Sequence, residues 1–307
     1  MSQKEVQNEP CGVLIIDKPD GMTSHDIVGK VRRLYNTRRV GHTGTLDPMA
    51  TGVLTVLIGR AAKAAEYLSA DRKTYLATLR LGLTTDTEDT TGRILTQSEQ
   101  IPDEAAVMAI LSRFRGEIMQ IPPMYSALKV NGQKLYDMAR RGEVIERQAR
   151  PITVYRLEAQ RLNDTDYALT VTCSAGTYIR TLCADIGAAL GCGGAMASLR
   201  RTEAGGFSLE QAYTPTALEE MTEEARTALL LPIDSLFADL SAVTLSAFHE
   251  RLIRGGCAVD QRKLGQKRDL GTRVRLINAA GEFFALGEVV IDENEALCIK
   301  SIKTFVL

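Results

Sequence analysis

One carboxylate, Asp47, stands in a short segment whose residue types suit the presentation of a reactive group. The segment, residues 38–54, reads RRVGHTGTLDPMATGVL, with two arginines before the acid and an apolar run after it. Pro48 disfavours helical backbone at Asp47, so the carboxylate is expected on an extended or turn-like backbone. A loop of this kind is a common way to present a reactive acid, and the simpler alternative is a turn closed by an Asx hydrogen bond. Three glycines permit backbone conformations and close approaches that other residues resist: Gly41, Gly44 and Gly52.

The segments around this loop predict both strands and helices. Apolar runs predict buried strands at residues 12–17 and 53–58, and an alternating pattern predicts a strand at 74–81. Ser24 is expected to cap the helix that follows it. The remaining expected elements are helices over 61–68, from Pro102 onward and after Thr177, a strand pair at 153–162 and 167–173, and a helix stop at residues 191–194.

The pattern changes near residue 243. Short strands are expected at 272–277, 283–291 and 296–303, with basic residues between them, which is typical of a separate small β domain. An acidic segment at 86–92 (DTEDTTG) resembles a calcium loop only superficially, because its ligand spacing and glycine position differ from those of an EF-hand. We interpret that segment as a polar connection.

Length and composition describe a soluble globular protein. The 307 residues are 45% hydrophobic and 24% charged, and this length predicts two domains. The first ten residues are polar, so a secretory signal is not expected there. No apolar run reaches the roughly 18–20 residues of a membrane helix, so a cytoplasmic protein without membrane contact is expected. The six cysteines lack a C-x-x-C pair and the three histidines lack ligand spacing, so no metal site is expected.

Basic residues gather in three segments although the net charge is only −1. These segments are residues 30–39, 129–150 and 251–275, and compensating acids lie elsewhere, notably at 219–224. Segregated charge on a nearly neutral protein is typical of nucleic-acid binding, and ordinary solvated faces are the alternative. Residues 120–150 are weakly periodic and contain proline, glycine and arginine, so a long functional loop is expected there.

Five motifs follow one another along the chain: IDKPxGxTS at 16–24, GHTGTLDP at 41–48, RKTY at 72–75, SxGTYIR at 174–180 and LRRT at 199–202. Together they resemble the motifs of the bacterial tRNA pseudouridine synthase B (TruB) family. The resemblance runs from about residue 11 to residue 237, and the remainder is similar to that family's C-terminal PUA-type domain.

The resemblance implies an α+β fold. A mixed, mostly antiparallel sheet flanked by helices is expected, with a small C-terminal β-barrel-like domain of PUA type. The implied organisation is a disordered tail over residues 1–10, a catalytic domain over 11–240 with a mobile RNA-binding insertion at 124–151, and an RNA-binding domain over 243–307.

The same resemblance implies an activity. Family members isomerise uridine 55 in the T arm of tRNA to pseudouridine by base flipping, C–N cleavage and C–C reattachment, without a metal or organic cofactor. A monomer with no obligatory protein partner is expected. Two alternatives remain open: a non-catalytic RNA-binding or tRNA-folding chaperone that uses the same surface, and the related guide-RNA-dependent synthases of archaea and eukaryotes.

Roles for individual residues follow from the motif matches. Asp47 matches the essential carboxylate, which forms an adduct at C1′ or assists a glycal-type elimination. Arg180 matches the arginine that pairs with this aspartate, and an arginine on a helix surface is the alternative. Tyr75 matches the tyrosine that stacks on the target base and handles the C5 proton, and a sheet-face tyrosine is the alternative.

The resemblance also implies substrate contacts. His42 matches the histidine that fills the vacated stack, and a loop histidine with local hydrogen bonds is the alternative. Tyr178 and the backbone of Leu199 match positions that contact the flipped uridine. Lys18 is included among the substrate-binding residues, where shaping the pocket is preferred over direct catalysis.

Overall fold

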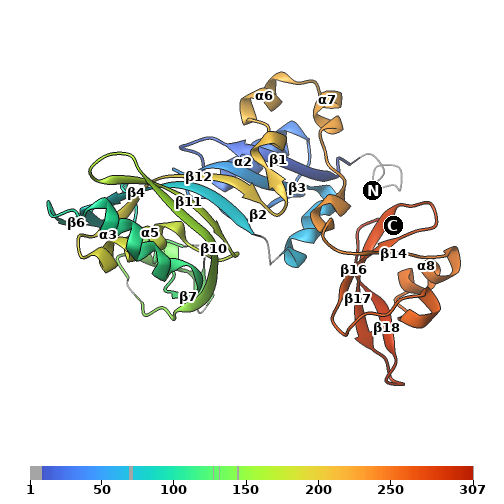
Figure 1. The fold of residues 1–307 in the computed structure, drawn as a ribbon. Helices are drawn as coiled ribbons and strands as arrows, with labels where there is room; N and C mark the ends of the chain where they lie inside the picture. Colours follow the sequence, from blue (N-terminus) through green and yellow to red (C-terminus); the bar gives the residue numbers. More distant parts are fainter. Residues whose placement is uncertain (1–8, 69–71, 127, 131, 144, 307) are drawn as a thin grey trace.

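A computed structural model describes residues 9–68, 72–126, 128–130, 132–143 and 145–306 (Figure 1). Two sheets organise the chain, one of nine strands and one of five, and helices cover parts of both. The expected α+β fold with a mostly antiparallel sheet and a small C-terminal β unit is confirmed. In the described part of the chain, no helix is long and apolar enough to span a bilayer.

The large sheet has the strand order β1-β3-β12-β4-β11-β10-β7, with β2 paired to β3 and β13 paired to β12. All pairs are antiparallel except β12 with β3. The strands are β1 (Gly12–Lys18), β2 (Val40–Thr43), β3 (Thr51–Ile58), β4 (Lys73–Leu81), β7 (Gly116–Gln120), β10 (Arg150–Arg161), β11 (Asp166–Cys173), β12 (Gly194–Ala204) and β13 (Phe207–Ser208).

Short helices and two small hairpins complete this part of the chain. The helices are α2 (Ser24–Leu34), α3 (Glu104–Ile110), α4 (Leu135–Arg140), α5 (Ile179–Leu190), α6 (Pro215–Glu220) and α7 (Glu223–Ala228), with 3₁₀ turns η1 (Gly59–Tyr67), η2 (Leu111–Phe114), η3 (Leu209–Gln211) and η4 (Ile233–Phe237). The hairpins are β5 (Leu83–Thr85) with β6 (Ile94–Gln97) and β8 (Lys129–Val130) with β9 (Gln133–Lys134).

Strands β1 and β3 are buried on both faces, which explains their continuous apolar runs. On β1, Leu14 and Ile16 face a core shared with α2 and α5, whereas Val13 and Ile15 face a second core. The second core also contains residues from beyond position 230, Phe237 among them. Sequence patterns found these two strands, but β2 and β12 were not expected as strands.

Helix α2 begins at Ser24, one residue earlier than expected. Thr23, not Ser24, is the N-cap: its hydroxyl accepts from the backbone N–H of Asp26, whose carboxylate accepts from the Thr23 N–H in return. The hydroxyl of Ser24 is buried and forms two hydrogen bonds with the backbone of Leu46, donating at 3.2 Å and accepting at 2.9 Å. Ser24 therefore ties the start of α2 to the residue before Asp47.

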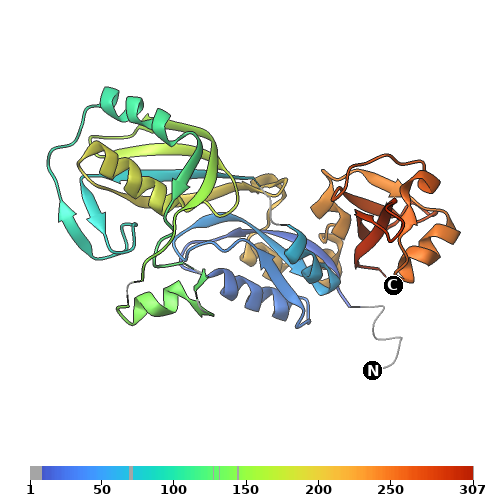
Figure 2. The ribbon, with the colours of Figure 1, turned by 90° about the horizontal axis from the view of Figure 1, so that it is seen from below.

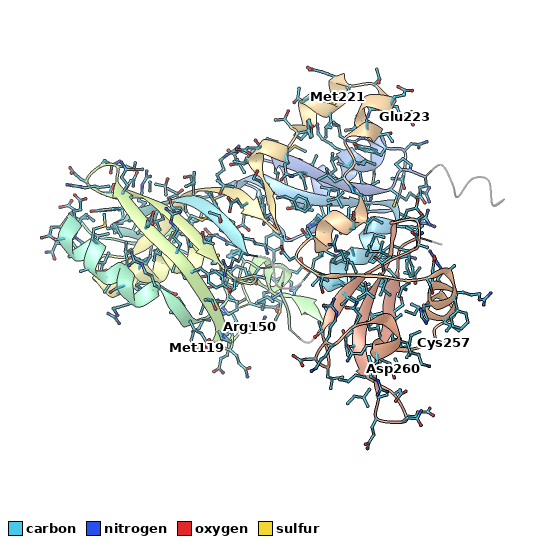
Figure 3. The ribbon with its side chains drawn as sticks, turned by 45° about the vertical axis from the view of Figure 1, so that its right-hand side comes forward. Met119, Arg150, Met221, Glu223, Cys257 and Asp260 are labelled. Carbon is cyan, nitrogen blue, oxygen red and sulfur yellow. The ribbon has the colours of Figure 1, made fainter. Side chains whose placement is uncertain are left out.

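The two ends of the insertion expected at residues 124–151 lie side by side on paired strands of the sheet. Strand β7 ends at Gln120, which pairs with Arg150 at the start of β10. Figure 3 shows Met119 and Arg150 together at this edge. Between them lie β8, β9 and α4, while residues 127, 131 and 144 lie outside the described residues. Residues 1–8 of the expected tail lie outside them as well.

The C-terminal unit packs on the end of the large sheet (Figure 2). Its sheet has the order β14-β16-β17-β18-β15. Phe237, which precedes the unit, contacts Phe283 and Phe305 with ring centroids 5.9–6.1 Å apart, so the two parts share one apolar core. The elements are β14 (Ala242–Thr244), α8 (Ala247–Arg254), β15 (Val259–Asp260), η5 (Gln261–Leu264), β16 (Arg273–Ile277), β17 (Phe283–Ile291) and β18 (Leu297–Thr304).

Because the C-terminal unit and the large sheet share one apolar core, we expect the C-terminal unit to stabilise the rest of the chain. Phe305→Ala should lower the free energy of unfolding by about 3–5 kcal/mol, because it opens a cavity in the core that joins the two parts. Urea denaturation followed by tyrosine fluorescence and circular dichroism measures this change. Val306→Ala, at the exposed neighbour, is the matched control and should change stability little. A loss below about 1 kcal/mol in Phe305→Ala would show that the two parts are not coupled through this core.

Candidate active site

A cavity of about 460 Å³ lies between the Asp47 loop, strands β4 and β12, the start of α5 and the insertion. Its walls include five of the seven residues that the sequence singled out: Asp47, Tyr75, Tyr178, Arg180 and Leu199. Residues far apart in the chain thus meet around one hollow. The other two expected residues, His42 and Lys18, lie behind or beside its walls.

The Asp47 carboxylate and the Arg180 guanidinium form a two-point ion pair. Arg180 Nε lies 2.9 Å from Asp47 Oδ2, and Nη2 lies 3.2 Å from Oδ1. The arginine is only 5% exposed, so it is not an arginine of the helix surface. Fork-to-fork contacts of this kind fix orientation as well as charge. The Asp47 carboxylate therefore faces the guanidinium and does not close an Asx turn.

Two further hydrogen bonds join Arg180 to backbone carbonyls. Nη1 donates to the carbonyl of Thr87 at 3.0 Å, and Nη2 donates to the carbonyl of Tyr125 at 2.7 Å. Asp89 Oδ2 lies 3.9 Å from Nη1. Because a guanidinium is planar and rigid, these partners from separate segments determine where Arg180, and with it Asp47, can lie.

The segment 86–92, interpreted from the sequence as a polar connection, takes part in this site. Its turn places Glu88 at a left-handed φ of +64°, and the Glu88 side chain accepts a hydrogen bond from Thr181 on α5. Asp89 Oδ1 accepts from the Thr87 hydroxyl at 2.8 Å and the Thr91 N–H at 3.0 Å. The interpretation was incomplete, because clustered Thr and Asp side chains can order a turn without regular periodicity.

Opposing influences act on the Asp47 carboxyl. Burial raises its pKa above the ordinary value, the Arg180 guanidinium lowers it, and the Asp89 carboxylate raises it, with a net upward direction. The side chain keeps 34% of its surface exposed, so a substrate in the cavity can reach it. The site thus holds an acid whose ionised form depends on its arginine partner.

Tyr178 is held in place by a residue that the sequence did not indicate. Gln120 is 2% exposed, and its side chain donates to the Tyr178 carbonyl at 3.0 Å and accepts from the Tyr178 N–H at 2.8 Å. A buried amide that satisfies both groups of one peptide residue fixes the backbone before α5. A glutamine at the end of an edge strand carries no sequence signal for this role.

The structure places His42 on strand β2, not in a loop. Its ring meets that of His25 edge-on at 6.0 Å, and His25 lines the cavity. Burial lowers the pKa of His42, and the neighbouring His25 lowers it further, which favours the neutral ring. In the described part of the chain, His42 Nδ1 is buried without a hydrogen-bond partner.

Lys18 lies beneath the loop and is not among the residues that line the cavity. It is completely buried, and its ammonium donates to the carbonyls of Pro19, Met22 and Pro48 at 2.6–3.0 Å. Burial lowers the pKa of Lys18 to about 8, against the opposing charges of Asp20 and Asp47. Its contacts shape the pocket by anchoring the residue after Asp47.

Two of the three loop glycines have a backbone conformation that favours glycine. Gly44 and Gly52 have φ of +73° and +101°. A Cβ at Gly52 would lie 2.1 Å from the carbonyl oxygen of Arg201, which no side chain can tolerate. At Gly41 a Cβ would meet only Ala62 at 4.0 Å, so that glycine is not needed for space.

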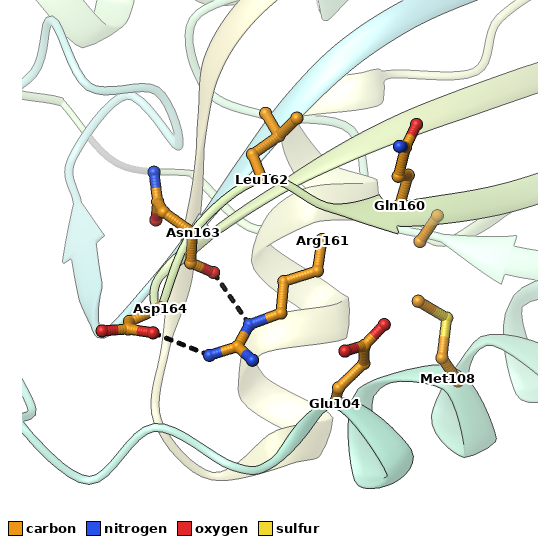
Figure 4. Close-up of a pocket in the computed structure, with 8 residues that line it drawn as sticks. Glu104, Met108, Gln160, Arg161, Leu162, Asn163 and Asp164 are labelled. Atoms are coloured by element: carbon orange, nitrogen blue, oxygen red, sulfur yellow. Dashed lines mark hydrogen bonds and ion pairs between the residues drawn. The ribbon is translucent and has the colours of Figure 1, made fainter.

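A second hollow, of about 590 Å³, lies between α3 and the turn joining β10 to β11 (Figure 4). Its Arg161 side chain donates to the Asn163 carbonyl at 3.0 Å and to Asp164 at 2.7 Å. These contacts brace the turn, and none of the expected site residues lines this hollow. In the described chain, no group of three or more His, Cys, Asp or Glu residues could hold a metal ion.

Comparisons with known proteins decide the family. The N-terminal domain model of TruB family pseudouridylate synthases matches residues 32–179, and the tRNA pseudouridylate synthase B C-terminal domain model matches residues 180–238. The tRNA pseudouridine synthase B of Burkholderia mallei (strain NCTC 10247) is 44% identical over 270 residues, 87% of this chain and 89% of that protein. The chain belongs to the TruB family. It is therefore a pseudouridine synthase.

Further matches cover nearly the whole length of this chain. The tRNA pseudouridine synthase B of Pseudomonas putida (strain F1) is 44% identical over 299 residues, 94% of this chain and 95% of that protein. Among solved structures, a Cbf5–Nop10–Gar1 complex matches with a TM-score of 0.75 and 27% identity, covering 98% of this chain and 87% of the matched chain. An H/ACA ribonucleoprotein bound to a substrate RNA containing 2′-deoxyuridine matches with a TM-score of 0.73 and 25% identity, covering 100% and 88%.

Removing the Asp89 charge should shift the pH dependence of pseudouridine formation. If the ionised Asp47 is required, activity is present above its pKa and falls as the pH drops through it. Asp89→Asn removes a charge that raises this pKa, so the acid limb of kcat/KM should move to lower pH while kcat itself falls. Initial rates from pH 4 to pH 8 measure both effects.

Asp86→Asn is the matched control, because Asp86 lies in the same turn and is not among the main groups that act on the Asp47 pKa. Its acid limb should coincide with that of the parent. An acid limb of Asp89→Asn that stays in place or moves to higher pH would contradict the electrostatic coupling.

Proposed function

We propose that this chain converts uridine 55 in the T arm of tRNA into pseudouridine, with Asp47 as the catalytic carboxylate. The observation that carries this proposal is the Asp47–Arg180 pair at a cavity lined by Tyr75, Tyr178 and Leu199. The cavity volume falls within the roughly 300–1,000 Å³ typical of ligand sites. Relatives with 44% identity are named tRNA pseudouridine synthase B, which supports tRNA as the substrate.

The reaction requires a nucleophile or charge stabiliser at the sugar. The C1′–N1 bond breaks and its electron pair leaves with the base. The ionised Asp47 either bonds to C1′ or, in a glycal-type elimination, takes the proton from C2′. The base then turns and C5 bonds to C1′, which breaks the Asp47–C1′ bond or, from the glycal, returns the proton to C2′. The C5 proton leaves and N1 takes up a proton, so that the C5–C6 double bond is restored. Arg180 keeps Asp47 oriented and ionised when the RNA excludes water from the cavity.

A uridine in a folded arm must leave its stack to enter this cavity, at a cost of a few kcal/mol. Tyr75 is 7% exposed and presents its ring at the cavity wall, which suits stacking on the flipped base and removal of the C5 proton. Tyr178 and the Leu199 backbone would contact the same base. His42, beside the cavity on β2, would occupy the gap left in the arm.

The basic segments would bind phosphates and not read bases. Arg33 and Arg38 are exposed in the segment that precedes β2, and Arg150 is exposed at the start of β10, where the insertion rejoins the sheet. Part of the basic charge is balanced inside the protein: in the segment 251–275, Arg262 pairs with Asp260 at 2.6 Å. A moderate salt dependence of tRNA binding is therefore expected.

Two other functions make different demands. A purely RNA-binding chaperone would not need the Asp47–Arg180 pair. Burying two charges is costly, and only a chemical role at this site would offset that cost. A guide-RNA-dependent synthase would need partners, as in the Cbf5 complexes that resemble this fold. Pseudouridine formation on an isolated T-arm hairpin, with this protein alone, would separate the stand-alone enzyme from the guided one.

Asp47→Asn should abolish pseudouridine formation and retain tRNA binding. The amide keeps nearly the same shape but has no charge with which to attack or stabilise C1′. Single-turnover assays with saturating enzyme, together with filter binding, measure the two quantities. Asp239→Asn, at an exposed aspartate outside the cavity, is the control and should remain fully active. Unchanged pseudouridine formation in Asp47→Asn would refute the proposed function.

Arg180→Ala should lower turnover far more than binding. We expect kcat to fall by about 10³-fold while the Kd for tRNA changes less than about threefold, because the arginine orients Asp47 and lies away from the protein surface. Arg180→Lys keeps the charge without the fork and should recover part of kcat. Arg156→Ala, at an exposed strand arginine, is the matched control. A loss confined to binding would contradict the positioning role.

A further inference from the structure

Gln120 is a buried amide at the end of the edge strand β7. It is only 2% exposed, whereas its neighbour Met119 is 62% exposed. Its backbone is paired with Arg150 at the start of β10. A buried amide in this position requires an explanation, because its desolvation is unfavourable unless its polar atoms are paired, and an apolar side chain would fill the same space without that cost.

Both polar atoms of the Gln120 amide bind the backbone of one residue, Tyr178. The Oε1 atom accepts from the Tyr178 N–H at 2.8 Å, and Nε2 donates to the Tyr178 carbonyl at 3.0 Å. These partners settle the orientation of the amide, because a backbone N–H can only donate and a carbonyl can only accept. The two bonds act on either side of the Tyr178 Cα, so they fix both its position and its direction.

Tyr178 lies where the chain passes from β11 into α5. Near the start of this turn, the Ser174 N–H donates to the Thr153 carbonyl at 2.8 Å, and the Ser174 hydroxyl accepts from the Thr153 N–H at 2.9 Å. At the end of the turn, Tyr178 is the N-cap of α5, and within the described residues its own side chain does not cap the helix. Gln120 therefore anchors the end of a turn whose beginning is anchored on β10.

This turn leads directly to the catalytic ion pair. Arg180 is the second residue of α5, and its Nε and Nη2 lie 2.9 Å and 3.2 Å from the two carboxylate oxygens of Asp47. The Arg180 side chain moves with the helix start that carries it, so a shift of the Tyr178 backbone would disturb both contacts. A displacement of about 1 Å in a catalytic group can lower a rate by about 100-fold.

The chain that follows Gln120 makes a second contact with the same helix start. The carbonyl of Tyr125 accepts from Arg180 Nη2 at 2.7 Å. Residues 120–125 thus contact the start of α5 at two places, the Tyr178 backbone and the Arg180 guanidinium. Contacts at two places restrict rotation of the helix start as well as its translation.

We propose that Gln120 is a positioning residue for the isomerisation: its amide holds the Tyr178 backbone and thereby sets the position of the Arg180 guanidinium. This inference rests on the proposed function only in that Arg180 orients Asp47 for the chemistry. Gln120 is not among the residues that line the cavity, so it acts on the reaction through the start of α5.

Gln120→Met removes the amide at nearly constant side-chain length and breaks both hydrogen bonds with Tyr178. We expect kcat for pseudouridine formation to fall about 30-fold, with KM for tRNA within about threefold of the parent, because the displaced group acts in the reaction and not in RNA binding. Initial rates over a range of tRNA concentrations measure both constants. Gln160→Met, the same substitution at an exposed position of β10, is the matched control and should keep the parent kcat.

A double-mutant cycle separates positioning from a general loss of stability. If Gln120 acts through Arg180, Gln120→Met should lower kcat by less than about threefold in an Arg180→Ala background, because the guanidinium that it positions is absent. Single-turnover rates with saturating enzyme are used for these slow variants. An equal fold-loss in the parent and in the Arg180→Ala background would overturn the proposal.

A spectroscopic signature tests the same link without RNA. Arginines labelled with ¹⁵N at Nε are observed by NMR, and the Arg180 signal is assigned by its absence in Arg180→Lys. In folded Gln120→Met this signal should shift, because the Arg180 Nε meets the Asp47 carboxylate in the parent, whereas Gln160→Met should leave it in place. An unchanged Arg180 signal in Gln120→Met, or a kcat within about threefold of the parent, would overturn the proposal.

Gln120→Asn is the second variant, in case Gln120→Met does not fold. It keeps a polar amide, but its side chain is one methylene shorter and cannot hold both backbone groups of Tyr178 in the parent position. Its kcat should fall by about tenfold or more and its Arg180 signal should shift, and parent values of either would overturn the proposal. If the parent forms no pseudouridine, the proposed function fails, whereas the Arg180 signals still decide the link between Gln120 and the start of α5.

Discussion

The Arg180 guanidinium is the group on which the arrangement of the site depends. It accepts no hydrogen bonds and cannot lose its proton, so each of its N–H groups needs an oxygen. Those oxygens come from the Asp47 loop, the 86–92 turn and the insertion, three segments that are distant in the chain. The ion pair with Asp47 therefore exists only when all three segments are in place, which couples the folding of this region to its chemistry.

Two further buried cations, Lys18 and Arg201, support the loop. Lys18 holds the Pro48 carbonyl, and Arg201 holds the Gly44 carbonyl, so the loop is fixed on both sides of Asp47. Both cations are almost fully buried and bond to carbonyl oxygens. These hydrogen bonds hold the backbone on either side of Asp47. Its carboxylate is therefore well positioned although Asp47 lies in neither a helix nor a strand.

Sequence reasoning could predict the strands that are buried on both faces, because continuous apolar runs such as residues 12–17 reveal them directly. It could also predict the Asp47–Arg180 pair, through the motif resemblance. It missed β12, because Arg200, Arg201 and Thr202 interrupt the apolar pattern. The buried Arg201 is tolerated there because carbonyls distant in the chain accept its hydrogen bonds. Gln120 and the 86–92 turn were missed for the same reason: their roles depend on contacts made only after folding.

The central claim, that the cavity at Asp47 isomerises one uridine of the tRNA T arm, is tested most directly by position-resolved mapping. Unmodified tRNA is incubated with the purified protein alone, and pseudouridine is located by carbodiimide modification and by mass spectrometry. The proposed function predicts complete conversion at position 55 and no conversion at other uridines. No pseudouridine, or pseudouridine only at other positions, would contradict the account.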